Sequence, residues 1–184
     1  MEKDLPSRKP TRHKDFDYCT EGYYFVTICT EEMRSYFGKI SKGEMKLNSM
    51  GKIVEKCWHA IPEHFKNIEL DYFQIMLNHI HGIIIVNGVG NANLAFPKMN
   101  NGNAKFASPT DRTKMTLSKV IQQFKRQVTI ETRSIINTKI FQRSFYDRII
   151  RNEKELYNIR KYIVDNPLKW ELEKGLPENL ELSF

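Results

Sequence analysis

The sequence predicts an α+β fold in which an antiparallel β-sheet carries packed helices. Three observations support this fold class. Residues 23–30 are aromatic or β-branched almost throughout, which is typical of a strand. Residues 51–61 place apolar side chains three or four positions apart, which is the spacing of a helix. Residues 79–86 form another strand-like run, which begins with two histidines and continues as an apolar sequence.

The other elements complete an alternating pattern of strands and helices. The first helix is expected to end at Pro62, because proline lacks the amide hydrogen that the helical ladder needs. Leu77 and Asn78 should form a tight hairpin before the histidine-bearing strand. The order β-α-β-β-α-β-α is that of the split βαβ, or ferredoxin-like, arrangement, with helices on one face of the sheet. The remaining strands and helices are expected at residues 68–76, 116–134, 140–146 and 153–165.

The chain is long enough for a single domain, which we assign to residues 18–184. Residues 1–17 form a basic N-terminal arm that should be solvated in the free protein. Residues 87–114 are rich in asparagine and glycine and lack periodicity, so a flexible insertion is expected there. No run approaches the roughly 20 apolar residues of a membrane span, and the N-terminus lacks a signal-peptide core. A cytoplasmic location without a membrane partner is therefore expected.

The composition bears on partners and on redox chemistry. The formal net charge is +7 and the pI is about 9.2, which favours a polyanionic partner such as nucleic acid. Cys19, Cys29 and Cys57 include no CxxC pair. This spacing argues against a disulfide framework and against a zinc knuckle, so three reduced thiols are expected.

The histidine-bearing strand begins with Asn78-His79-Ile80-His81-Gly82. Successive side chains of a strand alternate between its faces, so His79 and His81 should project to the same side. Two neutral imidazoles on one face could supply two of the three ligands of a metal site, or could bind a phosphate. A purely structural role for the two histidines fits the same pattern.

The last predicted helix contains the sequence Tyr162-Ile163-Val164-Asp165-Asn166-Pro167. At about 100° per residue, Tyr162 and Asn166 lie together on one flank of the apolar stripe of this helix. Pro167 is expected to end the helix, which would place Asn166 in its last turn. Taken alone, the tyrosine fits the edge of a core. Taken with the histidine pair, it gives a hard-cation site beside a hydroxyl nucleophile, which suits phosphoryl chemistry.

These motifs resemble those of a known family. His79-Ile80-His81 resembles the histidine-hydrophobic-histidine motif of HUH nucleases, and residues 162–167 resemble the YIxxNP signature of single-tyrosine HUH transposases. Within that superfamily the chain is similar to the REP-associated tyrosine transposases over nearly its whole length. Residues 76–78 depart from the usual Met-Pro-Asn of that branch without removing a catalytic atom. The other similar segments are residues 22–27, Trp58, 61–62, 141–147 and 149–153.

The resemblance implies a metal-dependent transposase or nickase that cleaves and rejoins single-stranded DNA at folded palindromic repeats. Tyr162 would be the nucleophile, forming a covalent 5′-phosphotyrosine intermediate and leaving a free 3′-OH. His79, His81 and Asn166 would hold a divalent cation, either Mg²⁺ or Mn²⁺. Such a protein would be nucleoid-associated when bound to DNA. It would act as a monomer or a homodimer, with its site assembled in cis or in trans.

Single-stranded or hairpin DNA is the partner that this interpretation requires. Candidates for contacts with the DNA backbone are basic residues of the N-terminal arm and of the second long helix. Simple solvation of a helix exterior is the alternative explanation for the second group. The candidates are Arg8, Lys9, Arg12 and Lys14 in the arm, and Lys119, Lys125, Arg126 and Arg133 in the helix.

Two other functions fit the sequence. One is a domesticated or inactive protein of the same fold that binds hairpin DNA without cleaving it. The other is an RNA-binding ferredoxin-like module in which Tyr23 and Phe25 stack on bases and the histidines are structural. Tyr162 and Asn166 have no role in such a module, so the DNA-cleaving enzyme is the favoured prediction.

Overall fold

The computed structural model describes residues 21–87 and 116–173. The predicted basic arm at residues 1–17 lies outside the described residues, as does nearly all of the asparagine- and glycine-rich segment 87–114. The part described contains a four-stranded sheet, a separate two-stranded ribbon and the helices that pack around them.

The central sheet confirms the predicted fold class. Its strands are β1 (Gly22–Cys29), β4 (Ile68–Ile75), β5 (His79–Val86) and β6 (Tyr146–Ile150), in the spatial order β4-β5-β1-β6. All neighbouring strands run antiparallel. The two central strands, β1 and β5, pair so that His81 lies opposite Thr27 and His79 lies opposite Cys29. This order is the one expected for a split βαβ domain.

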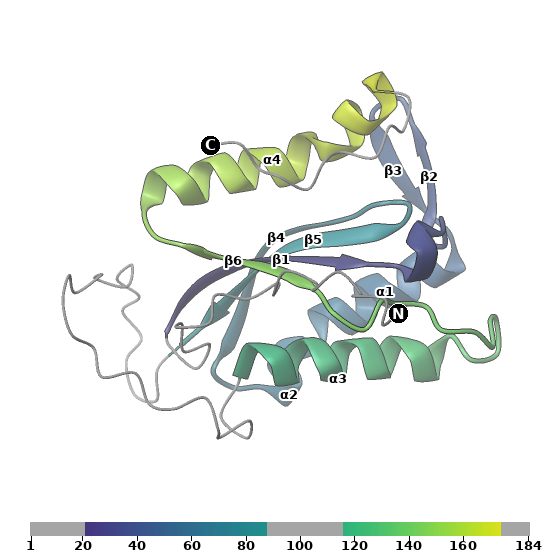
Figure 1. Cartoon of the computed structure of the whole chain (residues 1–184), viewed down its shortest axis with the longest axis horizontal. Coiled ribbons are helices and arrows are strands. Elements are labelled where there is room, and N and C mark those ends of the chain that lie inside the picture. Colours follow the sequence, from purple (N-terminus) through teal and green to yellow (C-terminus); the bar gives the residue numbers. More distant parts are fainter. Residues whose placement is uncertain (1–20, 88–115, 174–184) are drawn as a thin grey trace, which may run out of the picture.

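Helices cover both faces of the sheet, whereas the sequence predicted helices on one face (Figure 1). The helices α1 (Ser49–His59), α2 (Ile61–His64) and α3 (Thr116–Glu131) lie on one side, and α4 (Glu153–Leu172) lies on the other. The physical reason is that every residue of β5 is buried, so neither face of this strand can be left to water.

Among the described residues, no helix has both the length and the apolar character needed to cross a membrane.

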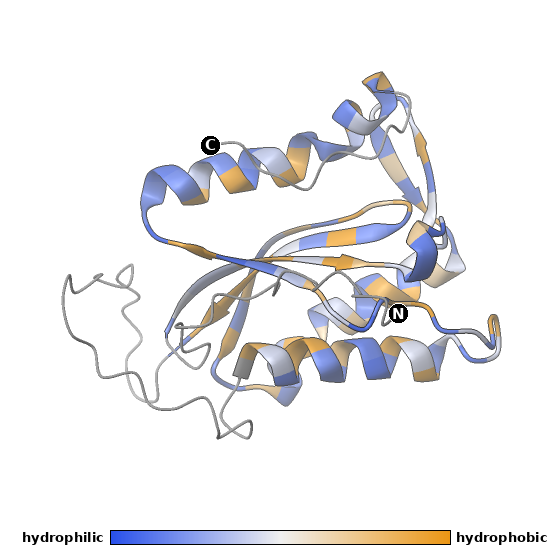
Figure 2. Cartoon of the chain, viewed as in Figure 1, coloured by the Kyte–Doolittle hydropathy of each residue, from blue (hydrophilic) through white to orange (hydrophobic). Residues whose placement is uncertain are grey.

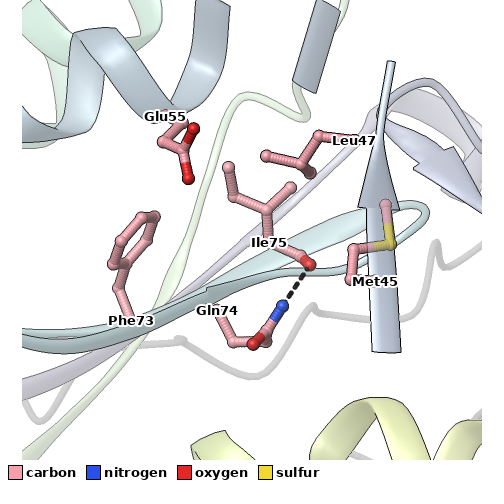
Figure 3. A pocket seen from close by; sticks show the side chains of 6 residues that line it. All are labelled: Met45, Leu47, Glu55, Phe73, Gln74 and Ile75. Carbon is pink, nitrogen blue, oxygen red and sulfur yellow. Dashed lines mark hydrogen bonds between the residues drawn. The ribbon is translucent and has the colours of Figure 1, made fainter. Parts of the chain in front are cut away.

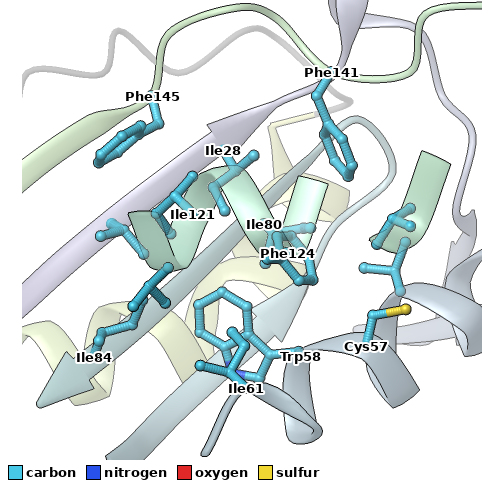
Figure 4. Packing of buried hydrophobic residues seen from close by; sticks show 14 of the residues in the cluster. Ile28, Cys57, Trp58, Ile61, Ile80, Ile84, Ile121, Phe124, Phe141 and Phe145 are labelled. Carbon is cyan, nitrogen blue, oxygen red and sulfur yellow. The ribbon is translucent and has the colours of Figure 1, made fainter. Parts of the chain in front are cut away.

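Two apolar cores result from this layering. The larger core lies between the sheet and α1 and α3, where Trp58 packs edge-to-face on Phe124 (Figure 4). A Cβ atom at Gly82 would lie only 2.3 Å from Cζ2 of Trp58, so the indole packs directly against the backbone of β5. The smaller core joins Phe25 and Ile83 to the apolar stripe of α4. Hydrophobic and hydrophilic residues alternate along α3 and α4, as covering helices require (Figure 2).

The strand predicted at residues 140–146 is displaced along the chain. The structure has a single bridge between Phe141 and Thr30, and the strand itself is β6, at residues 146–150. Ile140, Phe141 and Phe145 are all buried in the larger core, a spacing that does not alternate and so does not fit a strand. The apolar residues of the segment 140–145 therefore pack into the core, and the pairing with β1 begins after them.

The last helix continues past Pro167, so the prediction that proline ends it is wrong. α4 runs to Leu172, although Pro167 cannot donate a helical hydrogen bond. Contacts with the rest of the protein hold the final turns in place. The Glu171 carboxylate accepts hydrogen bonds from the backbone N–H groups of Lys42 and Gly43.

Lys42 and Gly43 belong to the turn of a ribbon that the sequence did not predict. Its strands are β2 (Gly38–Ser41) and β3 (Glu44–Leu47), which follow a short 3-10 helix at Glu31–Met33. Each strand has only four residues, too few for an alternation that can be told from chance. The ribbon leads into the start of α1 and extends toward the last turns of α4 (Figure 1).

Candidate functional site

The two predicted histidines lie on the face of β5 that α4 covers. Strand alternation turns Ile80 toward the larger core, while His79, His81 and Ile83 point to the opposite side. Both imidazoles are buried, with 6% of His79 and 0% of His81 exposed. The side-chain directions predicted from the sequence are therefore those seen in the structure.

The histidine pair is closely packed and electrically neutral. The Nε2 atoms of His79 and His81 lie 3.0 Å apart. Burial lowers the pKa of His79 to about 4, and burial together with the neighbouring His79 lowers the pKa of His81 well below its ordinary value. Near neutral pH both rings are therefore uncharged, which is the form of imidazole that binds metal ions.

Each imidazole is held by a partner on its other nitrogen. Nδ1 of His79 lies 2.8 Å from Oδ1 of Asn78, and Nδ2 of Asn78 donates to the carbonyl of Met33 at 3.1 Å. Because the amide nitrogen of Asn78 is engaged with Met33, its oxygen is the atom that accepts from His79 Nδ1–H. This assignment leaves the lone pair of His79 on Nε2. Nδ1 of His81 lies 2.9 Å from Oγ1 of Thr27, its cross-strand neighbour.

Tyr162 meets this pair from α4. Its phenolic oxygen lies 3.4 Å from Nε2 of His81, and the two rings have centroids 5.2 Å apart. Phe25 lies beneath both groups, stacked on His81 at 5.4 Å and edge-on to Tyr162 at 6.1 Å. The ammonium group of Lys169 is 5.3 Å from the centroid of the tyrosine ring. The hydroxyl is thus placed next to the histidines, and one lysine ammonium lies over the tyrosine ring.

Asn166 lies one helical turn after Tyr162 and is 1% exposed. Neither its amide oxygen nor its amide nitrogen has a hydrogen-bond partner among the described residues. Trp170, a further turn along, packs on His79 with ring centroids 5.9 Å apart. Because Tyr162 contacts His81 and Trp170 contacts His79, Asn166 between them shares the helix row that faces the histidine pair. A buried, unsatisfied amide in this position is costly unless something binds it.

This donor set fits a divalent cation. Two nitrogen ligands at about 2.1 Å from a metal and at right angles lie about 3 Å apart, and the observed Nε2 separation is 3.0 Å. Within residues 21–87 and 116–173, no three His, Cys, Asp or Glu side chains converge as a metal site. The third protein ligand would therefore be an amide oxygen, and the unpartnered carboxamide of Asn166 meets that requirement.

The predicted basic residues are not gathered at this site. Lys119, Arg126 and Arg133 are exposed on or just after α3, which covers the opposite face of the sheet (Figure 1). Lys125 instead holds the 140–145 segment, because its ammonium donates to the carbonyls of Gln142 at 2.9 Å and Ser144 at 2.8 Å. DNA contact by these helix residues stays a prediction. The arm residues Arg8, Lys9, Arg12 and Lys14 lie outside the described residues.

Sequence reasoning missed two residues of the site. Trp170 was missed because the helix was expected to end at Pro167, before the tryptophan. Thr27 was missed because its contact with His81 depends on the register of β1 against β5, which a single sequence does not specify. Phe25 was considered as a stacking platform for RNA bases, but it is 5% exposed and covered by His81 and Tyr162. This burial counts against the RNA-binding alternative.

A pocket of about 150 Å³ lies away from the histidine pair, between β3, α1 and the edge strand β4 (Figure 3). Its walls include Phe73 and Ile75 of β4, Met45 of β3 and Glu55 of α1. Neither histidine nor Tyr162 lines it. The pocket is therefore not part of the candidate site. Of the three predicted reduced thiols, Cys29 and Cys57 are free and buried, and Cys19 lies outside the described residues.

Comparisons with known proteins give a relative and a fold. No protein-family model matches the chain. The chain is 38% identical over 169 residues to an uncharacterised protein of Haemophilus influenzae, in an alignment that covers 89% of this chain and 90% of that protein. The solved structure of a REP-associated tyrosine transposase bound to a REP hairpin is similar, with a TM-score of 0.55 at 16% identity. That match covers 90% of this chain and 74% of the other, and shows a shared fold.

Proposed function

We propose that this chain, which belongs to the same family as the uncharacterised protein of Haemophilus influenzae, is a metal-dependent single-stranded DNA transposase or nickase. In this proposal it cleaves and rejoins DNA at folded palindromic repeats. The observation that carries the proposal is the position of the Tyr162 hydroxyl, 3.4 Å from the Nε2 atom of His81. His79 Nε2 lies a further 3.0 Å away. A hydroxyl nucleophile beside a neutral imidazole pair suits attack on a phosphodiester.

The proposed chemistry balances without an oxidant or an energy source. The phenolic oxygen of Tyr162 forms a bond to phosphorus, and the bond from phosphorus to the 3′ oxygen breaks. The 3′ oxygen leaves with the bonding electrons and gains a proton, while the phenol loses one. The product is a 5′-phosphotyrosine and a free 3′-OH. Attack by a 3′-OH on this phosphotyrosine reverses the step, so strands can be rejoined without ATP.

His79 and His81 through Nε2, and Asn166 through its amide oxygen, are the residues that would hold the cation. A bound Mg²⁺ or Mn²⁺ supplies charge neutralisation and orientation for the scissile phosphate. The other residues preorganise these ligands. Asn78 and Thr27 hold the imidazole rings, and such partners tune the affinity of a metal site.

The proposed DNA partner follows from the nucleophile and from the fold. A tyrosine that must reach one phosphodiester suits DNA whose backbone is accessible, such as a single strand beside a hairpin. The similar structure of the REP-associated tyrosine transposase, which is bound to a REP hairpin, supports the same substrate class.

The test is formation of a covalent protein–DNA adduct. End-labelled oligonucleotides with a palindromic stem and single-stranded flanks are incubated with the full chain and Mn²⁺ or Mg²⁺, then separated on a denaturing gel. We expect an adduct that disappears with chelator and in Tyr162→Phe, whereas Tyr162→Phe still binds the oligonucleotide. Tyr157→Phe is the matched control, because Tyr157 lies on the same helix but is 67% exposed. Binding without any adduct across a hairpin library would instead indicate an inactive hairpin-binding protein.

A further inference from the structure

We infer that the ribbon formed by β2 (Gly38–Ser41) and β3 (Glu44–Leu47) is the surface that binds the phosphate backbone of the DNA hairpin stem. This inference rests on the proposed function, and it names where the folded part of the substrate is held. It also differs from the sequence-based prediction, which assigned backbone contacts to the N-terminal arm and to α3.

The first observation is a pair of like charges directly opposite each other. Lys39 of β2 and Lys46 of β3 are cross-strand partners, and both are exposed. Like charges in opposite positions of an antiparallel pair destabilise the free protein. A third exposed lysine, Lys42, lies in the turn with a positive φ of 59°. A surface that costs stability in the free protein is explained if an anion neutralises it in the complex.

Lys39 and Lys46 have no ion-pair partner within the described part of the chain. Glu44 shares their face of the ribbon, but it forms no ion pair with Lys39 or Lys46, and no other described carboxylate does. Other exposed cations of the protein do have partners, such as Arg34 with Glu32 and Lys56 with Glu131. Lys39 and Lys46 of the ribbon therefore leave their charges to solvent, opposite each other on one face.

One face of the ribbon packs against the protein, and the other is exposed to solvent. Met45 and Leu47 point inward, where they pack against the larger core and line the pocket beside β4 (Figure 3). Strand alternation then places Lys39 and Lys46 on the outward face. The ribbon is thus anchored by one face and offers the other to a partner.

The ribbon is also tied to the helix that bears the nucleophile. The Glu171 carboxylate of α4 accepts hydrogen bonds from Lys42 and Gly43 at the ribbon turn. A Cβ atom at Gly43 would lie 3.0 Å from Cδ1 of Leu168, so the turn packs closely on α4. Nine residues of helix separate Tyr162 from Glu171, which corresponds to about 14 Å along the axis. DNA held by the ribbon would therefore lie at a defined distance from the reacting phosphate.

The occupant that fits this surface is duplex stem. A two-stranded β-ribbon has the width that enters the major groove of a duplex, and lysines on such elements contact phosphates. Phosphate contacts carry no base sequence, so the ribbon would position a stem without reading it.

The experiment measures binding alone, in a Tyr162→Phe background that does not react. Fluorescence anisotropy with a labelled stem-loop gives the Kd at several salt concentrations. We expect Lys39→Gln/Lys46→Gln to weaken binding roughly 10- to 100-fold near 0.1 M salt and to reduce the slope of log Kd against log salt by about two. The control, Lys52→Gln/Lys66→Gln, removes the same charge from exposed positions on and near α1 and α2. We expect the control to change the slope little.

A second readout excludes misfolding. Because the two lysines repel each other, the Tm of the ribbon variant should equal or exceed that of its parent. An unchanged slope in the ribbon variant, or an equal loss in the control, would overturn the inference. These results leave the proposed function standing if the wild-type chain forms the adduct. Failure of the Tyr162→Phe chain to bind any stem-loop would overturn the proposed DNA partner, and this inference with it.

Discussion

The phenolic oxygen of Tyr162 lies 3.4 Å from Nε2 of His81, although 81 residues of sequence separate the two. Both residues belong to one chain, so the histidine pair and the candidate nucleophile come together in cis. β5 supplies the imidazoles and α4 supplies the phenol, and the small core of Phe25, Ile83 and the α4 stripe holds these two elements together. The site therefore depends on how α4 is seated on the sheet.

Replacing Asn166 should have opposite effects on the stability of the metal-free protein and on its response to Mn²⁺. Because the amide is buried without a partner, we expect Asn166→Leu to raise the free energy of unfolding of the metal-free protein by about 1–3 kcal/mol. The same variant should lose the rise in Tm that Mn²⁺ gives to a protein whose folded state binds it. Thermal unfolding with and without Mn²⁺ measures both effects.

Asn152 offers the control for that variant. Its side chain caps α4 by accepting from the backbone N–H of Glu155 at 2.9 Å. Asn152→Ala should cost about 1 kcal/mol of stability and keep the Mn²⁺-induced rise in Tm. If Asn166→Leu lowers stability and still responds to Mn²⁺, Asn166 is a structural residue and not a ligand.

Acid should begin to destabilise the metal-free protein as the pH falls below about 6.5, which is above the range in which carboxylates are protonated. His79 has a pKa of about 4 in the folded protein, whereas an unfolded histidine has a pKa of about 6.5. Above pH 6.5 neither state is protonated and the stability is fully present. As the pH falls toward 4, only the unfolded state gains the proton, and this group alone removes about 3 kcal/mol. His81 shifts in the same direction.

Urea unfolding at pH 7 and at pH 4.5 measures this loss. We expect the difference in unfolding free energy between the two pH values to shrink in His79→Gln, which has no imidazole to titrate. His59 is exposed, so His59→Gln is the control variant in the same urea measurements. An equal pH dependence in wild type and His79→Gln would be inconsistent with a buried, neutral His79.

Asn78 should control the affinity of the proposed metal site without being one of its ligands. Its oxygen accepts from Nδ1 of His79, which fixes the ring and leaves Nε2 free. We expect Asn78→Ala to weaken Mn²⁺ binding about 10- to 100-fold, measured by isothermal titration. Asn78→Asp keeps an acceptor for His79 and should recover most of the affinity. The main-chain carbonyl of Asn78, which accepts from Thr30, remains in both variants.

Glu171 should hold the final turns of α4. Its carboxylate bonds to the N–H groups of Lys42 and Gly43, so Glu171→Ala removes the tether between α4 and the ribbon. In hydrogen exchange we expect faster exchange at the ribbon turn and at residues 168–172, with the amides near Ile159 and Ile163 unchanged. Glu173→Ala is the matched control at the same helix end. Identical exchange in both variants would show that the tether is dispensable.

The strongest local patterns were sufficient for much of the fold. β1 and β5 were predicted from continuous β-branched and aromatic runs, and α1 and α3 from clear helical spacing. The histidine pair and the Tyr162–Asn166 pair were placed correctly on their faces, because alternation in a strand and the 3.6-residue turn of a helix are local properties. That the two pairs meet was not a local property; it was inferred from their combined chemistry and from the resemblance to a family.

Features that depend on tertiary contact could not be predicted. The continuation of α4 past Pro167 relies on Glu171 and the ribbon turn, which lie more than 120 residues apart in sequence. α4 covers the second face of the sheet because Phe25 and Ile83 are apolar there, but strand burial on both faces was not inferred. The irregular segment around Phe141 resembled a strand in composition alone. It pairs with Thr30 through an isolated bridge, and its apolar residues Ile140, Phe141 and Phe145 are buried in the larger core.

Tyr162, the candidate nucleophile, and Asn166, the candidate amide ligand, lie one turn apart on one helix, while both imidazoles lie on a strand that this helix covers. A movement that lifts α4 from the sheet would withdraw Tyr162 and Asn166 together. If the proposed site is correct, a cation held by all three candidate ligands and a tyrosine close to the histidines would be gained or lost together. Under the proposed function, the seating of α4 on the sheet would therefore control the nucleophile and the cation site together.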